Sequence, residues 1–245
     1  MPDHRIERHN GNADAISRTT PSDLYSNFTI ALDVNTGKLA WYYQHVPGDD
    51  WDLDYTNERT LVRTRVSPDP KFVKWINPDI RKGEERDMVV TIGEGGGLFA
   101  MDRTNGQFLW ATPFPFDVPE FHISNIDGKT GKVSINWDVV FKGTLGETHT
   151  ACYWNARGYW PTAYHPGTNS LYTSWIDNCR EMTSASLGQR ATWKAIPRPG
   201  SNPTSSRAWR KSICQPERSY ASTWAARPAT AACWPPGKIW SSMET

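Results

Sequence analysis

The sequence predicts an all-β fold, and three observations support this prediction. The 245 residues include 13 Trp, 18 Gly and 18 Pro, a composition typical of short strands joined by tight turns. No long stretch of Ala, Leu, Glu and Lys indicates a helix. An eleven-residue strand, turn and strand motif occurs twice. With 38% hydrophobic and 22% charged residues the chain can bury a core, which excludes a disordered or collagen-like chain.

The charge balance excludes two classes of partner. Lys and Arg together number 27 and Asp and Glu 26, so the net charge of +1 gives no reason to expect a nucleic acid or an anionic membrane. No apolar run approaches the roughly 20 residues needed to span a bilayer, and the first five residues lead into no apolar signal core. The sequence therefore predicts no membrane span and no export signal within this chain.

The repeated motif predicts two β-hairpins of one type. Ala31–Trp41 and Ala100–Trp110 share Ala, Asp, Gly and Trp at corresponding positions. We expect the apolar pair to end a strand, the Asp to cap a turn closed by the Gly, and the next strand to carry the Trp. A third copy, Asn125–Val133, keeps the turn but lacks the Trp, and an ordinary hairpin is the alternative.

Repeated hairpins with a fixed aromatic residue are typical of propeller blades. The pattern Ala-x-Asp-x-x-Thr-Gly-x-x-x-Trp resembles the tryptophan-docking repeat of the PQQ-dependent (quinoprotein) alcohol and methanol dehydrogenases, in which the Trp wedges between adjacent blades. Residues 11 to about 200 resemble a continuous inner stretch of such an enzyme. The resemblance implies an internal fragment, a partial eight-bladed β-propeller with about three blades and unsealed sheet edges. A small complete β-domain is the alternative.

The chain changes character at Ser201. Residues 1–200 hold 21 Lys and Arg against 24 Asp and Glu, whereas residues 201–245 hold 6 against 2 and contain no Asp, Leu, Val or Phe. We therefore expect 1–200 to be the partial propeller and 201–245 an aberrant, poorly ordered tail. A shifted reading frame is the preferred explanation and a genuine basic tail the other. The coding DNA around Ser201 tests this.

The segment 47–54 holds four aspartates in six positions. Asp49 and Asp50 follow Pro-Gly and are predicted to be turn residues without a role in chemistry. Asp52 and Asp54 are two positions apart, which in an extended segment places both carboxylates on one face. A hard cation is the natural guest of oxygen ligands arranged in this way.

The resemblance gives these acids roles. It implies that Asp52 is the catalytic base and a metal ligand, and that Asp54 is a further ligand typical of lanthanide-dependent members. Asn12, which follows Gly11, corresponds to a metal-ligating Asn, although a turn is the alternative reading of that pair. The expected metal site is therefore Asn12, Asp52 and Asp54 around a lanthanide(III) ion or Ca²⁺.

Two positions depart from the family pattern at the quinone. Glu94 stands where the family usually has an Arg that reaches the quinone, and this exchange removes stabilisation unless another cation or the metal supplies it. Trp160 stands where many members have an Asn-Trp pair, so Trp160 retains the cofactor contact while Tyr159 cannot supply the amide. The residues expected to bind pyrroloquinoline quinone are Trp160 and Glu94.

The resemblance implies a periplasmic enzyme that oxidises a primary alcohol with metal-bound quinone and passes electrons to a cytochrome c-type acceptor. Asp52 would accept the hydroxyl proton. We expect the isolated 245 residues to be inactive. One alternative is a non-catalytic propeller scaffold with the same repeat. A glycosidase is disfavoured because its two carboxylates need roughly 5 to 9.5 Å between them on opposite sides of a sugar.

The cysteines and histidines give weaker signals. Cys152 and Cys179 match no metal-finger spacing, and unpaired or purely structural cysteines are the favoured interpretation over a disulfide. His149 and His165 have no paired spacing for a metal, and we expect solvent-facing or hydrogen-bonded roles for both.

Overall fold

The computed structural model describes residues 24, 26–142, 144–153, 156–158, 160–185, 192–201 and 207–213. Its regular elements are fifteen strands and the short 3-10 helix η3 (Pro166–Thr168), and the described residues contain no α-helix, which confirms the all-β prediction. The strands are β1 (Phe28–Leu32), β2 (Leu39–Gln44), β3 (Thr60–Val66), β4 (Trp75–Ile76), β5 (Glu84–Gly93), β6 (Gly96–Asp102), β7 (Phe108–Thr112), β8 (Ile123–Ile126), β9 (Val133–Ile135), β10 (Thr148–Cys152), β11 (Thr162–His165), β12 (Ser170–Ile176), β13 (Cys179–Thr183), β14 (Thr192–Ile196) and β15 (Arg207–Ile213).

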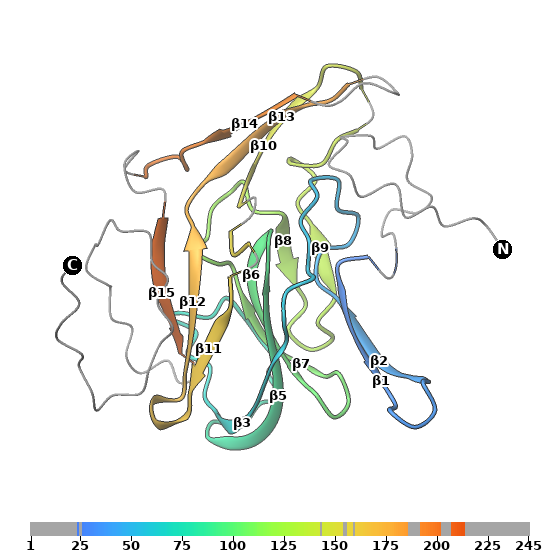
Figure 1. Cartoon of the computed structure of the whole chain (residues 1–245), viewed down its shortest axis with the longest axis vertical. Helices are drawn as coiled ribbons and strands as arrows, with labels where there is room; N and C mark the ends of the chain where they lie inside the picture. The colour runs from blue at the N-terminus through green and yellow to red at the C-terminus, as the bar shows by residue number, and fades with distance from the viewer. Residues whose placement is uncertain are drawn as a thin grey trace, which may run out of the picture.

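The strands form five antiparallel sheets. The largest has the order β3-β5-β6-β7-β4, and it is flanked by the sheets β11-β12-β15 and β10-β13-β14 and by the hairpins β1-β2 and β8-β9. In Figure 1 these sheets fan out around the central strands β5 and β6, with β11-β12-β15 on one side and β1-β2 on the other. Separate sheets arranged in this way are the expected architecture of part of a β-propeller.

Both predicted hairpins, and the hairpin of the degraded third copy, are present. The Oδ1 atom of Asp33 accepts the backbone N–H of Thr36 at 2.8 Å, and the backbone carbonyl of Asp33 accepts the N–H of Gly37 at 2.8 Å. Gly37 has a φ of 67°, a conformation that favours glycine. The same closing bond joins two further pairs, Asp102 to Gly106 and Asp127 to Gly131, each at 2.8 Å.

Trp41 docks the first hairpin against the next repeat. Its indole Nε1 donates to the carbonyl of Arg103 at 2.9 Å, in the turn between β6 and β7. The indole also covers Gly106 so closely that a Cβ there would lie 2.8 Å from the ring. Trp41 therefore packs against the neighbouring repeat, as the motif predicts, and the contact explains why a glycine closes the second turn.

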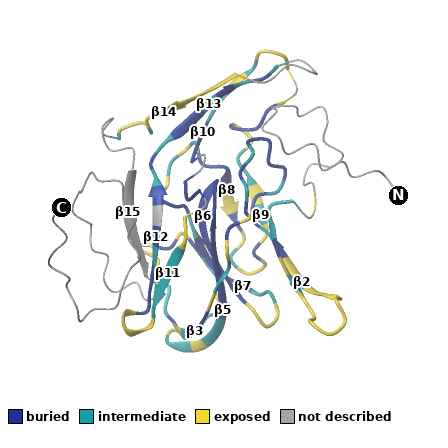
Figure 2. Ribbon diagram, viewed as in Figure 1, coloured by how far each residue is buried: buried dark blue, intermediate teal, exposed yellow. Residues whose placement is uncertain are grey.

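The hydrophobic core surrounds the central sheet. β6 is buried along its whole length and β7 along all but its last residue, as are the last six residues of β5, and Figure 2 shows this buried centre beneath exposed outer hairpins. Continuous burial requires that both faces of the sheet be covered. The sequences of these strands are therefore largely apolar, without the alternation of a strand that has one face in water. Aromatic residues contribute much of the packing on one face: Tyr43, Tyr55, Trp75, Phe99, Phe108 and Phe121.

Cys152 and Cys179 form a disulfide, which corrects the interpretation favoured from the sequence. The two residues are 27 positions apart, but the antiparallel register of β10 and β13 places them directly opposite each other. Both are fully buried. Spacing alone could not reveal this pairing, because it depends on which strands lie side by side.

The proposed boundary near residue 200 stays a prediction. β15 pairs with β12 along its length, from Ser170 opposite Ile213 to Ile176 opposite Arg207. The remaining residues from 202 to 206 and from 214 to 245 lie outside the described part of the chain. The shifted reading frame is a question for the coding DNA.

Candidate functional site

The acidic segment is held by its first two aspartates. Asp49 accepts the backbone N–H groups of Trp51 and Leu53, at 2.8 and 2.7 Å, and the side-chain amide of Asn27 at 2.8 Å. Asp50 Oδ2 accepts the N–H of Phe141 at 3.0 Å. Asp49 and Asp50 are buried, and these bonds give them the structural role that the sequence predicts.

Asp52 and Asp54 alternate with two deeply buried apolar residues. Trp51 and Leu53 are 0% and 1% exposed, and the Trp51 indole donates to the carbonyl of Val139 at 2.7 Å. Asp52 and Asp54 are half-buried. Asp52 has a φ of 63°, so the segment is not the regular extended strand assumed from the sequence. The apolar anchors hold the segment in place, and both aspartates stay partly exposed.

Glu94 joins this acidic group from the end of β5. Its backbone N–H donates to the carbonyl of Asp54 at 2.9 Å, and the residue is only 7% exposed. Burial, and after it the negative charges of Asp54 and Asp52, together raise the pKa of the Glu94 carboxyl to about 7. The backbone bond between Glu94 and Asp54 places these two residues side by side, and Asp52 lies two positions before Asp54 in the same segment.

Arg180 of β13 is a cation near Asp52 that sequence reasoning missed. It is 5% exposed, and its guanidinium carbon lies 4.4 Å from the centre of the Trp193 ring. Burial lowers the pKa of Arg180, while the charge of Asp52 raises it. The sequence offered only a weak signal, an arginine directly after a cysteine in an otherwise buried strand.

Trp160 lies on a loop that is tied to the acidic group. Its carbonyl accepts from Nε and Nη2 of Arg157 at 3.1 and 3.0 Å, and Arg157 also donates to the carbonyl of Ile92 at 3.1 Å. The fully buried Arg157 forms an ion pair with Glu58. In the same loop, the N–H of Ala156 donates to the carbonyl of Glu94 at 2.6 Å. The side chain of Trp160 is 40% exposed.

The structure therefore brings together only part of the predicted site. Glu94 bonds to the backbone of Asp54 in the acidic segment, and the Trp160 loop bonds to the carbonyls of Ile92 and Glu94. Asn12 and Tyr159 lie outside the described residues. Within the described part of the chain, no three Asp, Glu, His or Cys side chains lie close enough together to hold a metal ion. His149 bonds to the carbonyl of Asp138 and to Glu147, as expected for a hydrogen-bonded histidine.

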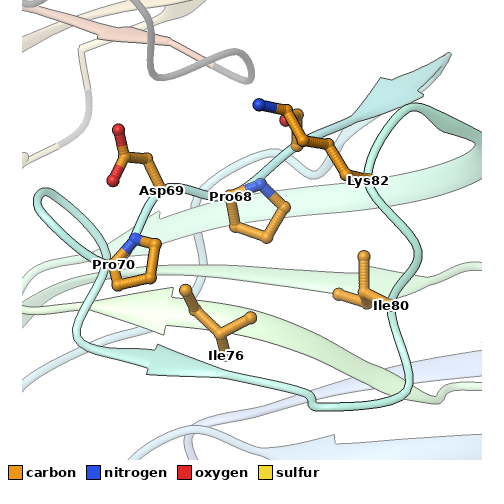
Figure 3. Close-up of a pocket in the computed structure, with 7 residues that line it drawn as sticks. Pro68, Asp69, Pro70, Ile76, Ile80 and Lys82 are labelled. Atoms are coloured by element: carbon orange, nitrogen blue, oxygen red, sulfur yellow. The ribbon is translucent and has the colours of Figure 1, made fainter.

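A surface pocket of about 320 Å³ lies away from these acids. Figure 3 shows it between the segments that flank β4, with Asp69 and Lys82 at its edge and Ile76 and Ile80 along one wall. None of the predicted site residues lines it. Its lining is mostly proline and isoleucine with Asp69 and Lys82 at the edge, and we do not assign it a role.

Comparison with known proteins defines the class of this chain. Residues 9–125 match the family model of the glucose/ethanol/alcohol dehydrogenase β-propeller domain, designated PQQ. The europium-containing methanol dehydrogenase has the same fold over 82% of this chain and 33% of its own, with a TM-score of 0.62 at 21% identity. The chain is thus a partial β-propeller of the PQQ type.

Its curated relatives are quinoprotein dehydrogenases. The chain is 29% identical over 150 residues to the quinohemoprotein alcohol dehydrogenase of Comamonas testosteroni, covering 61% of this chain and 18% of that protein. It is 32% identical over 99 residues to the alcohol dehydrogenase PedH of Pseudomonas putida, covering 40% and 14%. This chain is a relative of the quinoprotein alcohol dehydrogenases, as the repeat predicted, and it spans about a fifth of the length of the curated proteins it matches first.

In the described residues, no helix is long and apolar enough to cross a membrane.

Proposed function

We propose that this chain is the part of a PQQ-dependent alcohol dehydrogenase that carries the catalytic base, Asp52. The observation that supports the proposal most strongly is the position of the buried Glu94 beside the acidic segment, to which it is joined by the bond from its N–H to the carbonyl of Asp54. Burial first, and then the charges of Asp54 and Asp52, raise the pKa of Glu94 to about 7. Partly buried clusters of acids with perturbed pKa values are typical of sites for proton transfer or cation binding. The reaction is the oxidation of a primary alcohol.

The donor set fits a hard cation in its chemistry. Asp52 and Asp54 offer carboxylate oxygens, the ligands that calcium and lanthanide ions prefer. Burial and the charges of Asp54 and Asp52 raise the pKa of Glu94, so a cation bound here would lower the cost of ionising that carboxyl. Asp52 and Asp54 would hold a lanthanide(III) ion or Ca²⁺, together with Asn12 and groups beyond the described residues, because the described acids do not complete a site by themselves.

Pyrroloquinoline quinone, when bound, supplies the acceptor for the hydride of the alcohol carbon. Asp52 accepts the hydroxyl proton, a role for which general bases typically contribute about 10² to 10⁴ in rate. The hydrogen bonds of Asp49 to the backbone on either side of Asp52 fix this carboxylate in place. The exposed Trp160 ring offers a flat apolar face for a planar cofactor.

The partners follow from the same proposal. A small primary alcohol is the substrate and a cytochrome c-type protein receives the electrons. This assignment is supported by the name of one relative, the 1-butanol dehydrogenase (cytochrome c) of Thauera butanivorans, which is 27% identical over 154 residues. The periplasm is the proposed location, and the buried disulfide is consistent with an oxidising compartment.

The cation is tested by terbium luminescence, because Tb³⁺ replaces Ca²⁺ and lanthanides and is excited through nearby tryptophan. We expect saturable emission from the wild-type chain and binding at least tenfold weaker in Asp52→Asn and Asp54→Asn. Asp117→Asn is the matched control, since Asp117 is an exposed acid paired with Lys74. Equal affinity in all four proteins would contradict the metal site and favour the scaffold alternative, which has no use for these acids.

Turnover is tested separately. We expect no quinone-linked dye reduction by the 245 residues with pyrroloquinoline quinone and either Ca²⁺ or La³⁺ added, because the described acids supply only part of the site. Robust dye reduction by this chain would show that the remaining contacts are not required.

A further inference from the structure

The three copies of the hairpin turn differ at the residue before the closing glycine. This residue is Thr36 in the first copy and Thr130 in the third, and the hydroxyl of each donates to the aspartate that caps its turn. In the second copy it is Asn105, directly before Gly106. Asn-Gly pairs occur at 10–11 and 105–106, and only the second pair lies within the described residues.

An asparagine that precedes a glycine can react with its own backbone. The backbone nitrogen of the glycine attacks the side-chain carbonyl carbon of the asparagine, which is why asparagine counts among the thermolabile residues. Glycine favours this attack because it has no Cβ to hinder the approach. A threonine at the same position has no amide to react, so the second turn carries a chemistry that the other two turns lack.

The second turn presents Asn105 in a suitable arrangement. Asn105 is exposed, and its Oδ1 accepts the backbone N–H of Gln107 at 2.9 Å. This Asx turn closes a ring that contains both the side-chain carbonyl carbon of Asn105 and the backbone nitrogen of Gly106. The hydrogen bond also withdraws electron density from that carbonyl carbon and makes it a better electrophile.

One hydrogen bond opposes the reaction. The backbone N–H of Gly106 donates to the carbonyl of Asp102 at 2.8 Å, and this proton has to leave before the nitrogen can attack. The bond lies in a solvent-exposed turn, where backbone hydrogen bonds open at a lower free energy than in core strands. We therefore expect the folded chain to react more slowly than the unfolded chain, and still to react.

We propose that Asn105 is a site of spontaneous deamidation, which slowly converts the second turn into an isoaspartyl turn. The Gly106 nitrogen loses its proton to hydroxide and bonds to Cγ of Asn105. The bond from Cγ to Nδ2 breaks, and ammonia leaves with a proton taken from water. Water then opens the cyclic imide. Cleavage at the backbone carbonyl carbon gives isoaspartate and cleavage at Cγ gives aspartate. The proposal is independent of the catalytic assignment.

The isoaspartyl product alters the contact with Trp41. Its backbone runs through the former side chain, which lengthens the chain between residues 105 and 106 by a methylene group. Trp41 packs so closely on Gly106 that a Cβ there would lie 2.8 Å from the ring, and its indole donates to the carbonyl of Arg103 at 2.9 Å. A longer turn moves Gly106 relative to Arg103, so the junction between the two repeats weakens as the chain ages.

Peptide mapping by mass spectrometry tests the reaction on the full chain, kept for weeks at mildly alkaline pH. Asn35 is the internal comparison, because it is an exposed asparagine in the turn of the first copy and precedes a threonine. We expect isoaspartate and aspartate to form at least tenfold faster at residue 105 than at residue 35. In urea the rate at residue 105 should rise, because the bond from Gly106 to Asp102 is lost.

Two variants test the consequence for stability. Asn105→Thr restores the residue of the other two copies and cannot deamidate at this position. Asn105→Asp has the charge of the product without the longer backbone. We expect the aged wild-type chain to lose thermal stability in proportion to its isoaspartate content at residue 105. Aged Asn105→Thr should keep its unfolding midpoint, and fresh Asn105→Asp should unfold close to the fresh wild type.

Four outcomes would overturn the proposal. The first is absence of isoaspartate at residue 105 in the folded chain, and the second is a similar rate at Asn35. The third is an equal loss of stability in the aged wild type and in aged Asn105→Thr. The fourth is a fresh Asn105→Asp chain as unstable as the aged wild type, which would assign the loss to charge and not to the longer backbone.

Discussion

Four aspartates lie within six positions, yet each has a different environment. Asp49 and Asp50 are buried and accept hydrogen bonds from backbone N–H groups, so their carboxylates stabilise the fold. Asp52 and Asp54 are half-buried and act on Glu94 through space. The difference arises from position. The buried residues Trp51 and Leu53 flank Asp52 in the sequence, and they anchor the segment so that Asp52 and Asp54 keep part of their surface exposed.

Asp49→Ala should destabilise the chain. The variant loses three hydrogen bonds that hold the start of the acidic segment and leaves buried donors without an acceptor, so we expect a loss of about 2 to 3 kcal/mol in the free energy of unfolding. Urea denaturation measures the change. Asp49→Asn keeps one oxygen acceptor and should lose less. A loss below about 0.5 kcal/mol in the Ala variant would show that these bonds contribute little.

The raised pKa of Glu94 predicts that the stability of the chain depends on pH. Its pKa is raised from 4.5 to about 7 in the folded chain, so folding disfavours the ionised form. The contribution of this residue is complete below pH 4.5 and is lost as the pH rises to about 7. Glu94→Gln should therefore be more stable than the wild type at pH 8, by about 1 kcal/mol, and equal to it at pH 4.

Thermal unfolding at the two pH values tests this expectation. Asp117→Asn serves as a control for an exposed acid and should show no such difference between pH 4 and pH 8. A Glu94→Gln variant that is less stable than the wild type at pH 8 would mean that the carboxylate is stabilised by a cation in the folded chain.

At the scale of elements, one hairpin type occurs in two environments. Leu32 and Met101 occupy the same repeat position, but Leu32 is 55% exposed and Met101 is fully buried. We expect Leu32→Lys to change the free energy of unfolding by less than about 0.5 kcal/mol. Met101→Lys should cost more than about 3 kcal/mol or prevent folding, because it buries an unpaired charge. Circular dichroism melts compare the two, and similar losses would indicate that the face of β1-β2 is covered.

The hairpins were predictable because their chemistry is local. Asp33 and Gly37 define a turn within five residues, and the docking role of Trp41 follows from its offset in the repeat. Arg180 and the disulfide were not predictable. Arg180 approaches Asp52 across 128 positions, and Cys152 meets Cys179 only through strand pairing. Contacts of this kind depend on sheet order, which no residue pattern in this sequence specifies.

At the scale of the whole molecule, the disulfide links two neighbouring strands, β10 and β13. Replacing Cys152 and Cys179 together by Ala should cost about 3 kcal/mol, as expected for a closed loop of 27 residues. Thermal unfolding of the double variant, and of the wild type with and without reductant, measures this loss. An unchanged midpoint would mean that the bond adds nothing beyond the packing of the buried side chains.

The pairing of β10 with β13 also constrains biosynthesis. The thiol of Cys152 leaves the ribosome well before its partner, and the strand that presents the partner is complete only at Thr183. A thiol oxidase that acts during translocation would therefore meet Cys152 alone and risk joining it to another chain. The correct disulfide can form only after β13 has been synthesised. The yield of correctly folded protein should therefore depend more on when the oxidant acts than on its reduction potential.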